Sequence, residues 1–256
     1  MPADSPFDQQ RYVDHIEADL ARFAAAVRTG PLDAPVQGCP GWDLRQLTHH
    51  VGHIHRWSQL AVLTAENPRV AAFVEPGPDA GGDELADWLV AGGERLAATL
   101  RELDPQAPTW HPFLVERVAG VWPRRQAHEL AVHRWDAELA VGPAAPIDPE
   151  LASDGIDEFF EVTHPRTMAR ERATPPAGSL HVHCTDVAGE WLAWYDPAHQ
   201  GGGYHFTREH AKGDAALRGP AADILLALYH REHDADALSP VGDPDVLAAW
   251  LGAPGL

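Results

Sequence analysis

Two stretches of the sequence carry side chains that could bind a divalent metal ion. The first, GCPGWDLRQLTHHVGHIHRW at residues 38–57, places four of the chain's 16 histidines within seven positions: His49, His50, His53 and His55. The second, RRQAHELAVHRWDAELA at residues 124–140, contains glutamate, histidine and aspartate at helical spacing. Imidazole and carboxylate groups are preferred ligands of zinc and similar ions. The question is which of these side chains can meet.

The second stretch predicts a row of ionisable groups on one side of a helix. Glu129, His133 and Asp136 occur at i, i+4 and i+7, so they lie above one another along the helix surface. Apolar residues flank this row on both sides: Leu130, Val132, Trp135 and Leu139. Burying an ionisable row costs free energy unless a partner satisfies it, and a divalent cation would do so. The alternative is that Glu129 and His133 form an ordinary surface pair.

In the first stretch, helical periodicity distinguishes the four histidines. A helix that begins at Asp43 directs Leu44, Leu47, Val51, Ile54, Ser58 and Ala61 inward. His50 lies beside this stripe, whereas His49 and His53 are predicted to point towards solvent. His55 falls at the far margin of the stripe and, like the other two, is expected to be solvated. His50 is therefore the histidine expected to face the interior of a bundle, where it could meet Glu129 and His133.

These three side chains would supply two imidazoles and one carboxylate, and the remaining coordination positions would be open to water or substrate. Such an open ligand set is typical of catalytic rather than structural zinc sites. A second possible metal pair occurs in HVHC, because His181 and His183 would share one face of a strand. Neither a carboxylate nor a third ligand accompanies that pair at a telling spacing, so it is the weaker candidate.

The elements that must position these residues are mainly helical. Periodicity predicts four helices at about residues 9–27, 43–66, 83–103 and 123–141, which suggests an up-down four-helix bundle over residues 1–141. The Pro-rich segment GPAAPIDPE at 142–150 is predicted to be a linker.

Residues 151–256 are predicted to form a small α+β domain. SLHVHCTD and EWLAWYD alternate like strands around a short VAG turn, and GGGYHFTREH is a third candidate strand. PAADILLALYHRE and DPDVLAAWLG are predicted helices. The predicted fold class is therefore mainly α with a C-terminal α+β domain.

Composition excludes several classes of function. The net charge is −19 and the pI is about 5.1, so association with nucleic acid or anionic lipid is unfavourable. No run of residues approaches the length of a membrane span. Cys39 and Cys184 are far apart, which argues against a disulfide scaffold. Without a signal-peptide pattern, a reduced cytoplasmic compartment is expected.

Three segments resemble the actinobacterial maleylpyruvate isomerase family: CPGWDLRQLTHHVGHIHRW, RRQAHELAVHRWDAE, and LRGPAADILLALYHRE with VGDPDVLAAWL. Members of that family join a DinB-like helical domain to a smaller α+β domain. The resemblance implies that His50, Glu129 and His133 are the metal ligands. It implies zinc as the ion, although nickel, cobalt or manganese would suit the same ligands.

The resemblance also implies a mechanism. Family members use mycothiol, a low-molecular-weight thiol that adds to the double bond of maleylpyruvate; rotation and elimination then give the trans isomer. A metal that coordinates sulfur lowers the thiol pKa from about 8.5. Arg231 matches a family position and is the predicted holder of an anionic substrate. Arg218 is a second candidate, and Arg231 could equally be a surface arginine at a helix end.

Two further residues near the predicted ligands have open roles. Asp136 could orient a ligand imidazole, but an ion pair with a neighbouring helix is an equal alternative. Cys39 is interpreted as structural, because the nucleophilic sulfur would arrive with the thiol cosubstrate.

Two hypotheses about function follow. The first is a metal- and mycothiol-dependent isomerase or S-transferase acting on a small electrophilic, anionic molecule. The second is a non-catalytic metal-binding protein of the DinB-like class, acting in stress response or ligand binding. A water-filled cleft lined by a cation would favour the first, and a closed four-ligand site would favour the second. The sequence leaves the oligomeric state undetermined.

Overall fold

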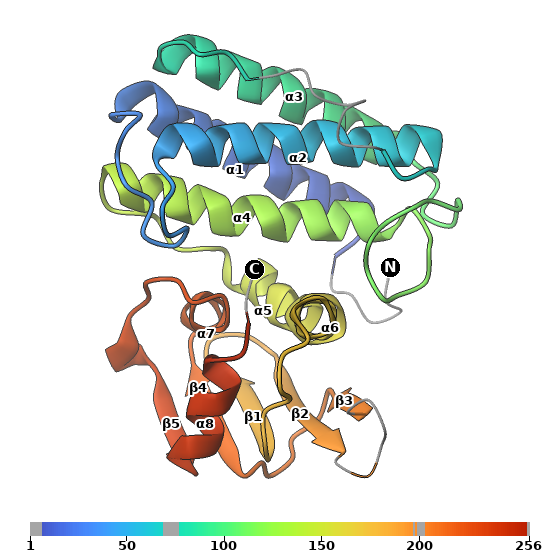
Figure 1. Cartoon of the computed structure of the whole chain (residues 1–256), viewed down its shortest axis with the longest axis vertical. Helices are drawn as coiled ribbons and strands as arrows, with labels where there is room; N and C mark the ends of the chain where they lie inside the picture. The colour runs from blue at the N-terminus through green and yellow to red at the C-terminus, as the bar shows by residue number, and fades with distance from the viewer. Residues whose placement is uncertain (1–6, 69–76, 197, 199–202, 255–256) are drawn as a thin grey trace. The chain divides into compact units, whose positions relative to one another are not determined.

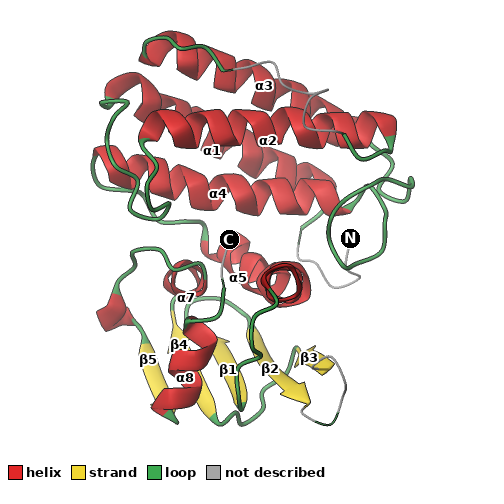
Figure 2. Ribbon diagram, in the orientation of Figure 1, coloured by secondary structure: helices red, strands yellow, loops and turns green. Residues whose placement is uncertain are grey.

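The computed structural model describes residues 7–68, 77–196, 198 and 203–254 (Figure 1). The chain divides into two compact units. One contains Met1–Pro112 and Glu116–Pro146, and the other contains Phe113–Val115 and Ile147–Leu256. The expected fold class is confirmed, since the first unit is helical and the second combines helices with one sheet (Figure 2).

Four long helices build the first unit: α1 (Gln9–Thr29), α2 (Leu44–Thr64), α3 (Gly82–Glu102) and α4 (Val121–Val141). Helix α1 packs mainly against α3 and α4, and α2 packs against the same two helices. Thus α1 and α2 lie diagonally across the bundle although they follow one another in sequence (Figure 1). The face that α1 turns to its neighbours is apolar. The predicted stripe of α1 is almost completely buried: Tyr12, Ile16, Leu20, Phe23 and Val27.

Helix α4 differs from the others because it is buried on nearly all sides. Besides apolar residues, its buried positions include Arg124, Arg125, Arg134 and Asp136. Arg134 shows how such a charge is accommodated. Its Nε lies 3.1 Å from Asp19 Oδ1 on α1, and its Nη1 lies 2.9 Å from Glu138 Oε2. Among the described residues, the most buried helix of the bundle therefore also carries most of the buried ionisable side chains of the bundle.

The second unit contains a five-stranded sheet. Its strands are β1 (Ser179–Cys184), β2 (Glu190–Asp196), β3 (Gly203–Thr207), β4 (Ala215–Gly219) and β5 (Ser239–Gly242). The order is β3-β2-β1-β4-β5; β1 and β4 are parallel and the other neighbours are antiparallel. The first three strands correspond to those predicted from the sequence.

Helices cover the apolar face of this sheet. They are α5 (Pro149–Glu158), α6 (His164–Glu171), α7 (Ala221–Leu228) and α8 (Pro244–Leu251), with a π-helical turn, η2 (Phe159–Thr163), joining α5 to α6. A short 3₁₀ turn, η3 (Ala235–Ala237), precedes β5. Helix α7 packs on β4, and α8 packs on β1 and β4. Leu180, Val182, Ala193 and Leu217 are at most 2% exposed on this face.

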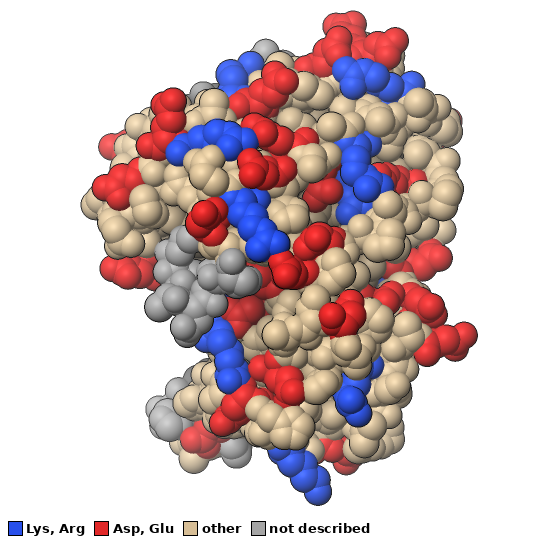
Figure 3. Space-filling model, turned by 180° about the vertical axis from the view of Figure 1, so that it is seen from behind, with Lys and Arg blue, Asp and Glu red and all other residues tan. Residues whose placement is uncertain are grey.

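Charged side chains of both signs share the surface. On the side of the chain drawn in Figure 3, basic side chains lie among acidic ones. Arg101, for example, pairs with Asp14 at 3.0 Å and with Glu17 at 2.7 Å. Within the described residues, none of the helices combines the length and apolar character that crossing a bilayer requires.

Candidate metal centre

Helix α2 begins where the sequence predicts, and its first turn is fixed by a capping box. The Asp43 carboxylate accepts a hydrogen bond from the Gln46 backbone N–H at 2.8 Å, and the Gln46 side chain accepts one from the Asp43 N–H at 2.9 Å. Reciprocal bonds of this kind satisfy two otherwise unpaired donors. The His50 ring follows in the second turn, with its centroid 4.9 Å from that of Trp42.

The structure brings the three predicted ligands together. His50 Nε2 on α2 and His133 Nε2 on α4 each lie 3.4 Å from the same atom, Glu129 Oε1. The two imidazole centroids are 5.3 Å apart. Exposure of the side chains falls from 32% for His50 to 14% for Glu129 and 9% for His133. The cluster is thus enclosed on the α4 side and open on the His50 side.

Neighbouring side chains hold these groups in position. Arg125 donates to Glu129 Oε2 at 2.8 Å, which leaves Oε1 directed at the two imidazoles. Asp136 Oδ2 accepts from His133 Nδ1 at 3.0 Å and is itself almost completely buried. Holding the proton on Nδ1 leaves Nε2 as the free nitrogen of His133. Asp136 therefore contacts the imidazole of His133, one of the predicted ligands, and its role in orienting that ring stays a prediction.

The charges of the cluster are strongly coupled. Burial alone would raise the pKa of Glu129, but hydrogen bonds with His133 and His50 and the charge of Arg125 hold that pKa well below its usual range. Burial would likewise lower the pKa of His133, yet bonds with Asp136, Cys39 and Glu129 raise it well above normal. Glu129 is thus kept ionised and a positive charge on the neighbouring His133 ring is favoured; a bound cation would take the place of the proton on Nε2.

A divalent cation fits this donor set. Two Nε2 atoms and Oε1 lie within 4.8 Å of one another, and their types are those preferred by zinc, cobalt and nickel. His50, Glu129 and His133 would hold the ion, and Asp136 and Arg125 would fix two of these ligands.

Sequence reasoning missed how close Cys39 lies to this centre. Its sulfur is 3.7 Å from Asp136 Oδ2, and Cys39, His133 and Asp136 form a second group whose ligand atoms are within 4.8 Å. The signal was present in the loop CPGW directly before α2. Since Asp136 already occupies His133 Nδ1, the arrangement favours Cys39 as a neighbour of the centre over a ligand.

The other histidines of α2 have separate environments. His49 Nε2 lies 3.3 Å from the Pro78 carbonyl oxygen, and the His53 ring lies against Trp88. The expectation for His55 was wrong, because it is 1% exposed and its burial lowers its pKa to about 3. The facing helix α3 carries Gly93, where a Cβ would lie 3.2 Å from His55 Nδ1. That glycine leaves room for an imidazole inside the bundle.

Arg231 and Arg218 belong to the second unit. Arg231 is 6% exposed, and its Nη1 donates to the Tyr229 carbonyl oxygen at 2.8 Å, so it is not a surface arginine. Arg218 lies on β4 and is exposed. A role for Arg231 in holding an anion stays a prediction. His181 and His183 share a face of β1, as expected, but a carboxylate and a third histidine do accompany them: Glu190 and His210.

The fold and the convergence of His50, Glu129 and His133 define a helical-bundle protein with a candidate divalent-metal centre and an attached α+β domain. Residues 13–138 match the family model described as the mycothiol maleylpyruvate isomerase N-terminal domain. Residues 150–249 match the C-terminal domain model of the same family. The chain belongs to the mycothiol-dependent maleylpyruvate isomerase family.

Two solved structures share this fold. One is a mycothiol-dependent maleylpyruvate isomerase, with 15% identity and a TM-score of 0.55; the other is a histidine-to-alanine mutant of an enzyme with that name, with 14% identity and a TM-score of 0.56. Each comparison covers 91% of this chain and 93% of the other chain. No curated protein matches the chain.

Proposed function

We propose that this protein is a divalent-metal-dependent, mycothiol-dependent isomerase or S-transferase acting on a small electrophilic molecule that carries a carboxylate. The observation that carries the proposal is the shared position of Glu129 Oε1, which lies 3.4 Å from both His50 Nε2 and His133 Nε2. Family membership supports the thiol cosubstrate and the reaction class.

The residues of the candidate centre have different proposed roles. His50, Glu129 and His133 would hold the ion, with zinc the expected metal. A bound zinc ion would lower the pKa of a coordinated thiol, so that the thiol reacts at neutral pH. Asp136 keeps the His133 proton on Nδ1, away from the ion. The 32% exposure of the His50 side chain leaves one side of the centre open to small molecules.

The expected reaction class is cis–trans isomerisation of a maleylpyruvate-type substrate. Thiol addition converts the double bond into a single bond, rotation follows, and elimination restores both the double bond and the free thiol. The reaction needs a nucleophile but consumes none, so neither cysteine of the chain is required. We propose Arg231 as the residue that holds the substrate carboxylate, since guanidinium groups bind carboxylates with two parallel hydrogen bonds.

The test combines metal content with activity. Protein purified without a histidine tag would be compared with His50→Ala and Glu129→Ala by elemental analysis, and assayed for conversion of maleylpyruvate to fumarylpyruvate with and without mycothiol. We expect each variant to lose one ion per chain and the thiol-dependent activity. His49→Ala is the matched control, because its ring contacts Pro78 instead of the cluster.

The outcomes separate the two hypotheses about function. An ion count per chain that is the same in both variants as in the wild type would contradict the assignment of these ligands. A second result would contradict the enzyme proposal: both variants lose an ion, but the wild-type protein shows no activity towards maleylpyruvate or other electrophiles. That result would favour the non-catalytic metal-binding protein.

A further inference from the structure

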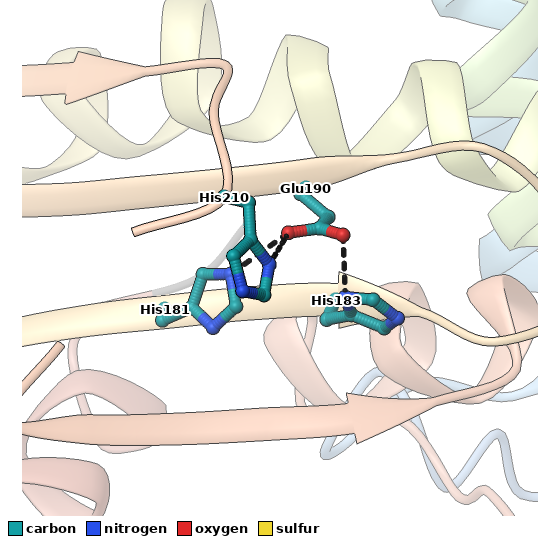
Figure 4. Close-up of side chains that lie close together, drawn as sticks. All are labelled: His181, His183, Glu190 and His210. Carbon is teal, nitrogen blue, oxygen red and sulfur yellow. Dashed lines mark hydrogen bonds and ion pairs between the residues drawn. The ribbon is translucent and has the colours of Figure 1, made fainter. Parts of the chain in front are cut away.

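The second unit contains a histidine cluster that the proposed activity does not use. It lies on the face of the sheet opposite to the one that α7 and α8 cover. Along β1, Leu180 and Val182 are fully buried on the helix-covered face, so the intervening His181 and His183 point to the other face. The antiparallel register places Glu190 of β2 directly opposite His183. His210 comes from the loop after β3 (Figure 4).

The three imidazoles converge on one carboxylate. His183 Nδ1 lies 2.8 Å from Glu190 Oε1, while His210 Nδ1 and His181 Nε2 lie 2.5 and 3.4 Å from Oε2 (Figure 4). All four ligand atoms are within 4.8 Å of one another. With zinc–ligand bonds of 2.0–2.2 Å, the ligands of a tetrahedral site are separated by about 3.3–3.6 Å. The 3.4 Å between His181 Nε2 and Glu190 Oε2 is close to that value. The other two distances are shorter, so His183 and His210 would have to move slightly away from Glu190 to admit an ion.

One nitrogen of this cluster, His181 Nε2, is placed so that it could bind an ion. His181 Nε2 is buried and makes no hydrogen bond to the residues that the structure describes, although Glu190 is near. Buried polar atoms are normally paired, so an unpaired nitrogen directed at a carboxylate calls for an explanation. A neutral imidazole carries a lone pair on one of its two ring nitrogens. A metal ion would accept that lone pair.

We propose that His181, His183, Glu190 and His210 form a second divalent-metal site, distinct from the centre in the helical unit. Three imidazoles and one carboxylate suit zinc, cobalt, nickel or copper, whereas calcium and magnesium prefer oxygen ligands. Two ligands come from a rigid strand and a third from its hydrogen-bonded neighbour, which fixes most of the site before an ion binds. The exposed His210, whose side chain is 83% accessible, completes the site from a loop.

One nearby charge opposes cation binding and limits the affinity. Arg218 of β4 is the residue opposite His183 in the parallel strand register, so the backbone of a positively charged residue lies next to the site. Arg218 is an exposed residue, and water and salt screen exposed charges strongly. Three imidazoles and an ionised glutamate are therefore expected to outweigh it.

The test counts zinc ions bound to metal-stripped, untagged full-length protein by titration and elemental analysis, with cobalt absorption as a second readout. We expect two ions in the wild type and one in His183→Ala. Glu190→Gln, a milder change at a half-buried position, should also bind one. His205→Ala is the control: His205 stacks on Trp194 of the same sheet and should leave two ions bound.

The outcomes also separate this site from the proposed active centre. If His50→Ala binds one ion and the double variant with His183→Ala binds none, both sites stand. If His183→Ala and Glu190→Gln both bind as many ions as the wild type, the second site is overturned. If His183→Ala loses an ion but His50→Ala does not, the second site stands and the proposed function fails.

Discussion

Asp136 provides a graded test of how the bundle prepares His133 for metal binding. Replacement of Asp136 by asparagine is expected to weaken zinc binding at the centre about tenfold, and replacement by alanine about 100-fold. Asparagine keeps an oxygen that can accept from His133 Nδ1 at the observed 3.0 Å, but it lacks the negative charge that makes Nε2 more basic. Alanine removes both the charge and the hydrogen bond.

These factors correspond to about 1.4 and 2.7 kcal/mol of binding free energy, at about 1.4 kcal/mol per tenfold change. The effect should be retained in salt solution, because the Asp136 side chain is 1% exposed and is screened little. Burial also means that water cannot easily replace the lost acceptor in the alanine variant. The alanine variant should therefore approach the upper value.

The assay is competition for zinc between metal-stripped protein and a chromophoric chelator at constant pH, in a His183→Ala background that removes the second site. Asp19→Asn is the matched control, because Asp19 also binds an α4 side chain, Arg134, next to His133. That control should change stability without changing zinc affinity. Affinities of both Asp136 variants within threefold of the parent would refute the orienting role.

Two further predictions concern stability. Burial lowers the pKa of His164 to about 4, whereas in the unfolded chain this pKa is about 6.5. Between these two pH values the unfolded chain binds a proton at His164 and the folded protein does not, so the free energy of unfolding decreases as the pH falls. Between pH 7.5 and pH 5, chemical denaturation should show a decrease in the free energy of unfolding that is about 2 kcal/mol larger in the wild type than in His164→Gln. Equal decreases in the two proteins would contradict this prediction. Gly52→Ala should cost about 1–3 kcal/mol in the same assay, since its Cβ would lie 2.1 Å from the Trp88 ring, whereas Gly142→Ala, with open space, should cost less. Similar costs for the two alanine variants would argue against the steric reason.

The helical unit could be predicted closely because its signals are local. The stripe from Tyr12 to Val27 is buried as its periodicity indicates, and Asp43 caps α2 as expected. The approach of His50 to Glu129 and His133 was also predictable, since Glu129 and His133 are one turn apart and His50 borders an apolar stripe. The periodicity of a single helix does not show which helices surround it. The burial of His55 was missed for that reason.

The second unit was harder because its contacts are long-range. Strand β4 joins the sheet through parallel pairing with β1, and residues 185–214 separate the two. Strand β5, Ser-Pro-Val-Gly, is exposed throughout and has no alternating apolar pattern. The histidine cluster depends on the same register. His181 and His183 were visible as a pair, but only the hairpin places Glu190 opposite them.

The Pro-rich segment that follows α4 is more firmly held than its composition suggests. Arg134 donates to the carbonyl oxygen of Ala145, and the Ala145 N–H donates to Glu138 at 3.0 Å. Ile147 is 1% exposed, and Asp148 caps α5. A protease must detach this segment before it can cut, so the cleavage rate would follow the free energy of local opening. The segment therefore resists the nicking that usually separates domains at a linker.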